Sequence, residues 1–90
     1  MPRLRIPTPL RPYAGGQSEV TLQGKTVGAA LDDLTNHYPA LRQHLFTEQG
    51  ELRAFVNLFL NEEDIRQMEG VDTPLDEADT LMLIPSIAGG

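Results

Sequence analysis

The chain opens with alternating polar and apolar residues. Residues 3–6 (Arg-Leu-Arg-Ile) suit a strand that buries one face. Pro7, Pro9 and Pro12 lack the amide hydrogen that a strand ladder needs, so we expect an irregular arm or bend after this strand. Alternation returns in residues 17–24, after glycines that indicate a turn. The two segments therefore predict a hairpin, or a looser pair if the proline arm lies between them.

A helical period replaces the alternation from residue 26 onward. Apolar residues then recur at spacings of three and four and form one stripe: Val27, Ala30, Leu31, Leu34 and Tyr38. Thr26 is expected to cap the helix, because its hydroxyl can accept a hydrogen bond from an amide of the first turn. Pro39 is expected to end the helix near Tyr38. Leu41, Leu45 and Phe46 predict a further short turn.

The longest strand signal covers residues 54–61 (AFVNLFLN), which are aromatic, β-branched and alternating. One set of alternate positions is Val56, Leu58 and Leu60; the other is Phe55, Asn57 and Phe59. The acidic sequence NEED predicts a turn, and Ile65 is expected to start a short return strand. A loop over 70–79 follows, with Leu75 as its buried apolar residue.

The last strand is predicted from Thr80 to Ile84. Leu81 and Leu83 are expected to point into the core, and Met82 and Ile84 away from it. Pro85 has no amide hydrogen and is expected to end the ladder.

These elements fit one domain of 90 residues with 40% hydrophobic and 22% charged residues. Their order is strand, strand, helix, strand, short strand, strand. That order predicts an α+β fold, with one main helix against a mixed sheet of four to five strands. It is the order of a β-grasp domain. We expect this domain to cover residues 1–85 and a tail to cover residues 86–90.

Charge and composition exclude several classes of function. The net charge of −6 argues against a nucleic-acid surface, which needs clustered Lys and Arg. Residues 61–80 hold most of the acidity against one base, Arg66, and form a solvated face or a surface for a basic partner. The chain has no cysteine, which excludes disulfides, thiolate metal ligands and thiol nucleophiles. His37 and His44 are seven residues apart, but no carboxylate or thiol completes a site with them, so no metal site is expected.

The N-terminal residues carry charges and prolines where a secretory signal would have an apolar run. No stretch of about 18 apolar residues is present to span a membrane. We therefore expect a soluble, cytoplasmic protein.

The tail, Ser86-Ile87-Ala88-Gly89-Gly90, begins directly after the predicted last strand. Five extended residues span at most about 16–18 Å. Glycines let the backbone approach another protein's catalytic groups closely, since they carry no Cβ atom. A flexible chain end or a cloning scar is the alternative interpretation. Placed after a complete domain, this tail instead predicts that the functional group is the terminal carboxylate of Gly90.

Three sequence segments carry a family resemblance. The segments VNLFLNEEDIR and LDEADTLMLIPSIAGG, together with the length of the chain, resemble the MoaD/ThiS-like, ubiquitin-like sulfur carriers. The N-terminal segment IPTPLRPYAGGQ resembles the CysO-type branch more specifically. The resemblance covers essentially the whole chain and is least specific over residues 43–52.

The resemblance implies that Gly90 is adenylated by an E1-like adenylating and sulfurtransferase enzyme, which uses ATP, and is then converted to a thiocarboxylate. It also implies a second partner that accepts the sulfur. That partner would resemble a cysteine synthase or the large subunit of molybdopterin synthase. The chain itself would then bind no cofactor and would be a carrier, not an enzyme.

Phe59, Met82 and Ile84 are candidates for an exposed apolar patch where such partners dock; a packed core or a dimer contact is the alternative for these residues.

Two rival functions share the same fold. One is a ubiquitin-like modifier joined to targets through Gly90, for which Lys25, the only lysine, would be the internal site of chain growth. The other is a β-grasp binding module with a dispensable tail.

Overall fold

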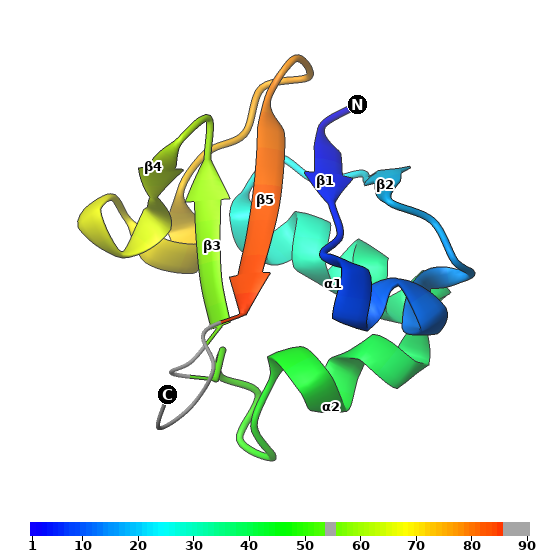
Figure 1. The fold of residues 1–90 in the computed structure, drawn as a ribbon. Coiled ribbons are helices and arrows are strands. Elements are labelled where there is room, and N and C mark those ends of the chain that lie inside the picture. Colours follow the sequence, from blue (N-terminus) through cyan, green and yellow to red (C-terminus); the bar gives the residue numbers. More distant parts are fainter. Residues whose placement is uncertain (54–55, 86–90) are drawn as a thin grey trace.

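The computed structural model describes residues 1–53 and 56–85. Within these residues one mixed sheet is formed by β1 (Arg3–Arg5), β2 (Glu19–Thr21), β3 (Val56–Leu60), β4 (Glu63–Asp64) and β5 (Thr80–Pro85). The strand order is β2-β1-β5-β3-β4 (Figure 1). Strands β1 and β5 are parallel, and the other neighbours are antiparallel. The predicted mixed sheet is confirmed, with β1 and β2 as the looser pair.

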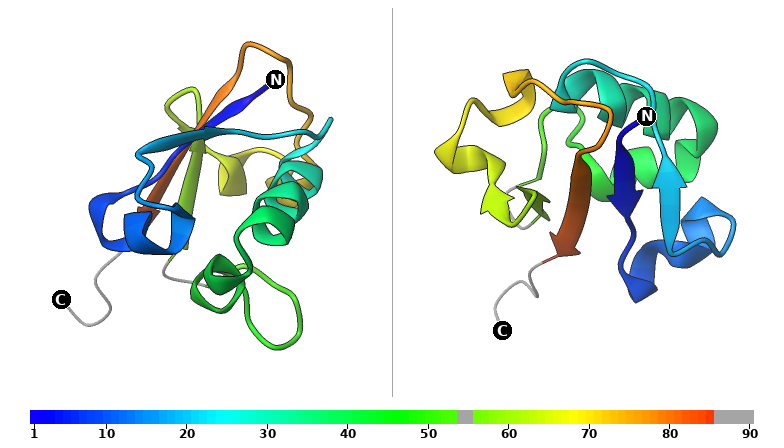
Figure 2. Two further views of the ribbon diagram at one scale, coloured as in Figure 1. Left: turned by 90° about the vertical axis from the view of Figure 1, so that its right-hand side faces the viewer. Right: turned by 90° about the horizontal axis from the view of Figure 1, so that it is seen from above.

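Helices α1 (Val27–His37) and α2 (Arg42–Leu45) lie on the same side of this sheet (Figure 2). Short 3-10 helices connect the other elements: η1 (Thr8–Ala14), η2 (Pro39–Leu41), η3 (Ile65–Gln67) and η4 (Gly70–Asp72). In the part of the chain that the structure describes, α1 is the one long helix, as predicted. We call the face of the sheet that is turned towards α1 the inner face, and the opposite one the outer face.

Helix α1 begins and ends where its sequence indicates. The Thr26 hydroxyl accepts a hydrogen bond of 3.2 Å from the amide of Ala29, which satisfies one donor of the first turn. The helix ends at His37, and Pro39 opens η2 instead of continuing α1. The predicted cap and stop are both confirmed.

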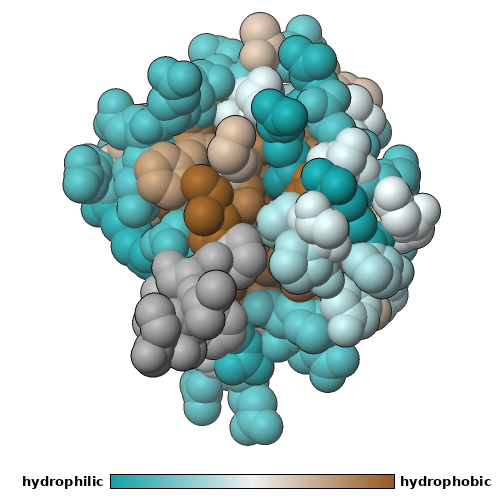
Figure 3. All heavy atoms as spheres, viewed as in Figure 1, coloured by the Kyte–Doolittle hydropathy of each residue, from teal (hydrophilic) through white to brown (hydrophobic). Residues whose placement is uncertain are grey.

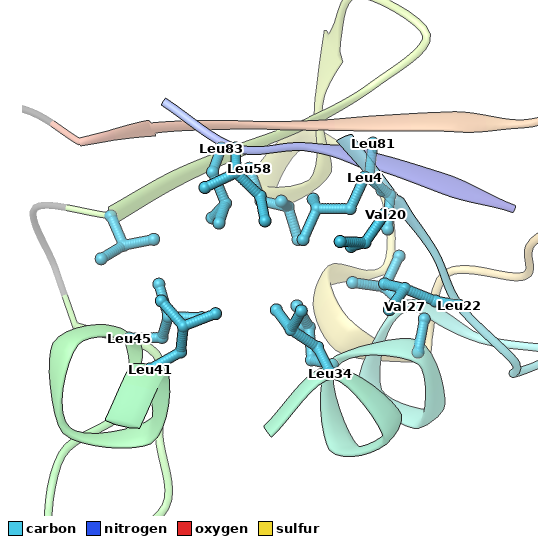
Figure 4. Packing of buried hydrophobic residues seen from close by; sticks show 14 of the residues in the cluster. Leu4, Val20, Leu22, Val27, Leu34, Leu41, Leu45, Leu58, Leu81 and Leu83 are labelled. Carbon is cyan, nitrogen blue, oxygen red and sulfur yellow. The ribbon is translucent and has the colours of Figure 1, made fainter. Parts of the chain in front are cut away.

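The core fills the space between the inner face and the two helices (Figure 4). Leu4, Leu58 and Leu81 from the sheet and Leu34 and Leu41 from the helical layer are each at most 1% exposed. Burying one such side chain contributes roughly 1.5–3 kcal/mol. Leu75 is 8% exposed, so the loop over 70–79 is anchored by the residue predicted for it.

Two local predictions are wrong. Residues 8–14 form η1, not an irregular arm, because Pro9 lies in the first turn, where no amide donor is needed. The return strand is β4, two residues before its predicted start, and Ile65 begins η3. The reason is the turn of Asn61 and Glu62, which places Glu63 directly opposite Leu60.

The limits of the strands also differ from those predicted. Strand β2 is three residues long, whereas the alternation covered 17–24. Residues 54 and 55 of the predicted third strand lie outside the described residues. Strand β5 includes Pro85, paired in register with Val56, because a proline still fits extended backbone and lacks only the amide donor.

Candidate functional site

The outer face of β5 carries the residues that the sequence predicts for docking. Met82 is 37% and Ile84 41% exposed, whereas Leu81 and Leu83 are buried as expected. Phe59 is half-buried on β3 and is the register partner of Met82. The fold thus brings Phe59, Met82 and Ile84 together on one face of two adjacent strands. Their role in docking stays a prediction.

These side chains border a groove of about 440 Å³ on the outer face. Figure 3 shows this face, where hydrophobic surface gathers over β3 and β5 and polar side chains surround it. The lining residues are Arg5, Phe59, Asn61, Glu62, Thr80, Met82 and Ile84. We call this feature the outer groove.

A tight turn closes one end of the outer groove. Asn61 and Glu62 have φ of 49° and 78°, the two positive values of a type I′ turn, and they join β3 to β4. The Asn61 side chain donates to Asp79 Oδ1 at 2.8 Å and accepts from the amide of Thr80 at 3.1 Å. These bonds fix the turn to the start of β5.

Arg66 contacts the start of β3. Its guanidinium donates to Asn57 Oδ1 at 2.7 Å and to the carbonyl of Val56 at 2.8 Å. Asn57 and Val56 lie opposite Ile84 and Pro85 in register, and β4 pairs only with the far end of β3. Arg66 therefore stabilises the start of β3 beside the last described residues of β5. In the sequence, Arg66 is notable only as the single base of an acidic segment. Its hydrogen bonds to the start of β3 were therefore not predicted.

The predicted tail lies outside the described residues. The tail comprises Ser86, Ile87, Ala88, Gly89 and the predicted reaction site, Gly90. Gly90 is the fifth residue after Pro85 in the sequence.

The two histidines contact different partners. His37 Nδ1 is 3.5 Å from Asp33 Oδ1, one helical turn away on α1. His44 packs against Tyr13, with ring centroids 4.2 Å apart. Among the described residues, no three His, Cys, Asp or Glu side chains gather as a metal site would require. No helix in the described part of the chain is long and apolar enough to cross a membrane.

The sequence model of the ThiS family matches residues 4–90. The chain belongs to the ThiS family. The predicted resemblance to the MoaD/ThiS-like proteins is confirmed over essentially the whole length of the chain.

Individual relatives place this ThiS-family chain beside the CysO-type branch. It is 39% identical over 87 residues to the sulfur carrier protein CysO of Mycobacterium tuberculosis, covering 94% of each chain. The crystal structure of that CysO superposes with a TM-score of 0.88 over 97% of this chain and 100% of the other. The predicted β-grasp fold and CysO-type branch are therefore confirmed.

Two further relatives are relevant to the predicted docking partner and to the alternative function as a protein modifier. The Amycolatopsis orientalis CysO, solved in complex with BexX, superposes over all of both chains with a TM-score of 0.91 and 33% identity. Small archaeal modifier protein 3 of Haloferax volcanii is 35% identical over 65 residues, which cover 72% of this chain and 70% of that protein. The CysO relatives are named as carriers, which supports the prediction that this ThiS-family chain is not an enzyme.

Proposed function

We propose that this ThiS-family chain is a sulfur carrier that bears its sulfur as a thiocarboxylate on Gly90. The observation that carries the proposal is the match to a sulfur carrier of the CysO type over 94% of both chains. The fold supports it, because the outer groove includes Ile84, which lies two residues before the sequence Ser-Ile-Ala-Gly-Gly.

The chemistry follows from the weakness of a carboxylate as an electrophile, since its charge is shared between two oxygens. An E1-like adenylating enzyme would join the Gly90 carboxylate to AMP from ATP and release pyrophosphate. A reduced sulfur donor would then attack the acyl carbon and AMP would leave. Gly90 is left with a nucleophilic sulfur that stays covalently bound to the carrier. ATP is consumed by the partner, and the carrier binds no cofactor of its own.

The outer groove is the proposed docking surface for these partners. Phe59, Met82 and Ile84 supply apolar area that the described residues leave uncovered. A relative solved in complex with a partner supports docking as the mode of action. The second partner would be a sulfur-accepting synthase. Cysteine biosynthesis is the favoured destination of the sulfur, and molybdopterin or another sulfur-containing cofactor is the alternative.

A protein modifier is the second candidate function, favoured by the likeness to a small archaeal modifier protein. The same activated Gly90 would then be attacked by a lysine amine instead of by sulfur. Lys25 is exposed, so it is accessible as the only internal lysine of this chain. The two functions differ in product: a terminal thiocarboxylate in one case and an isopeptide bond in the other.

Removing Gly89 and Gly90 tests the proposal. The shortened chain and the full chain are each incubated with the adenylating enzyme of the same organism, ATP and a sulfur donor. We expect mass spectrometry to find sulfur on the full chain alone, with equal melting temperatures for both. Isopeptide products without any thiocarboxylate would favour the modifier. An unmodified full chain, in the presence of an enzyme that is active on another carrier, would contradict both functions.

A further inference from the structure

The outer groove lies along one row of residues that crosses the sheet. Arg5 on β1 is the register partner of Met82 on β5, and Met82 is the register partner of Phe59 on β3. Register partners share a face of the sheet, so Arg5, Met82 and Phe59 form one row in which the cationic side chain neighbours Met82 directly. Arg5 is exposed and lines the groove.

The natural partner of Arg5 within the chain is engaged elsewhere. Glu19 lies directly opposite Arg5 in register, but its carboxylate is 3.8 Å from the guanidinium of Arg3. In residues 1–53 and 56–85, no ion pair or side-chain hydrogen bond is found for Arg5. The groove is therefore bordered on its β1 side by a guanidinium that no carboxylate of the described chain neutralises.

The opposite border of the outer groove carries the opposite charge. Glu62 occupies the turn between β3 and β4, is exposed and lines the groove. The apolar side chains lie between Arg5 and Glu62. The groove therefore has a direction, from positive at β1 to negative at the turn, in a protein whose net charge is −6.

We propose that the outer groove binds a protein surface with an apolar side chain at its centre, a carboxylate over Arg5 and a basic side chain over Glu62, and that this surface belongs to the adenylating partner. The inference rests on the proposed function, because it takes Gly90 as the group acted upon. An enzyme that acts on Gly90 must come within about 16–18 Å of the end of β5. The groove includes Ile84, which directly precedes Pro85 there.

The charges of Arg5 and Glu62 would determine mainly the orientation in which the adenylating partner binds. A guanidinium binds a carboxylate through two parallel hydrogen bonds, which fixes angle as well as distance. Opposite charges at the two ends of an apolar groove favour one docking direction and oppose the reversed one. A single direction is useful here, because the tail has to enter the partner's active site from a defined side.

Exchanging the two charges tests this polarity without altering net charge. The variant carries Arg5→Glu together with Glu62→Arg. Its control carries Lys25→Glu together with Glu77→Lys, two exposed positions that do not line the groove. Both are titrated with the purified adenylating enzyme of the same organism, and thiocarboxylate formation is followed over a range of carrier concentrations. Melting temperatures check that both variants fold.

We expect the groove variant to raise Kd and KM about tenfold, with kcat unchanged, because two favourable pairs become like-charge contacts. The control should stay within about twofold of the unaltered chain. Equal affinity of the groove variant and the unaltered chain would overturn the inference while leaving the proposed function intact, and so would equal losses in groove variant and control. If the unaltered chain is never loaded, the proposed function fails, and the inference fails with it.

Discussion

The two faces of strand β5 differ in what their side chains do. On the inner face, Leu81 and Leu83 are 0% and 2% exposed and belong to the core. On the outer face, Met82 and Ile84 are 37% and 41% exposed and border the outer groove. Alternate residues of β5 thus have different roles: the inner ones stabilise the fold, and the outer ones are available to contact a partner. Substitutions on the two faces should accordingly affect different measurements.

The largest expected effect is on the inner face. Leu83→Ala should lower the free energy of unfolding by about 2–5 kcal/mol, because it leaves a cavity in a packed core. Ile84→Ala, the next residue, should cost less than about 1 kcal/mol. Denaturant unfolding of both variants measures the difference, and equal losses would contradict the division between the faces.

The next effect concerns recognition on the outer face. Ile84→Asp should weaken binding of the adenylating enzyme about tenfold or more, because a charge replaces apolar contact area in the groove. Thr21→Asp adds the same charge at an exposed position outside the groove and is the matched control. Binding is measured by titration calorimetry. Unchanged affinity of the Ile84 variant would remove the groove from the docking surface.

Arg66 does not follow the division between buried residues that stabilise the fold and exposed residues that contact partners. It is exposed, yet its hydrogen bonds stabilise the start of β3. Arg66→Met should lower the free energy of unfolding by about 1 kcal/mol. Amide hydrogen exchange should become faster at Asn57 and its neighbours, and Arg66→Lys should restore part of the protection. If exchange is unchanged, Arg66 does not stabilise the start of this strand.

The smallest effect is expected from the ion pair of Arg3 and Glu19. Their side chains are 54% and 43% exposed, and Arg3 Nη1 is 3.8 Å from Glu19 Oε1. Glu19→Gln should change the free energy of unfolding by less than about 0.5 kcal/mol at low salt and by less at high salt. A larger loss in thermal unfolding would mean that the outer face contributes more to folding than its exposure indicates.

The elements that the sequence predicted well are those set by local periodicity. The stripe of α1, its Thr26 cap and the alternation of β3 and β5 each follow from residues close together in the chain. A buried face imposes its period on the sequence, so these elements can be read without knowing their neighbours. The exposed positions of Met82 and Ile84 followed from the same alternation.

The features that were missed depend on residues far apart in the chain. Arg66, in η3, reaches Asn57 across the turn after β3 and across β4, and nothing in the local sequence indicates that bond. The availability of Arg5 depends on Glu19 pairing with Arg3, which follows from register and side-chain conformation. The prolines at positions 7, 9 and 12 were expected only to break a strand. A proline also fits the first turn of a helix, as Pro9 does in η1.

The most direct test of the central claim is the mass of the protein isolated from its native cells. Fragmentation should place the mass increase of one sulfur replacing one oxygen on Gly90. The increase must be located within the chain, because oxidation of Met1, Met68 or Met82 adds nearly the same mass. Sulfur on the terminal glycine is the predicted result. A Gly90 that never carries sulfur, in cells that contain the adenylating enzyme and a sulfur donor, would contradict the account.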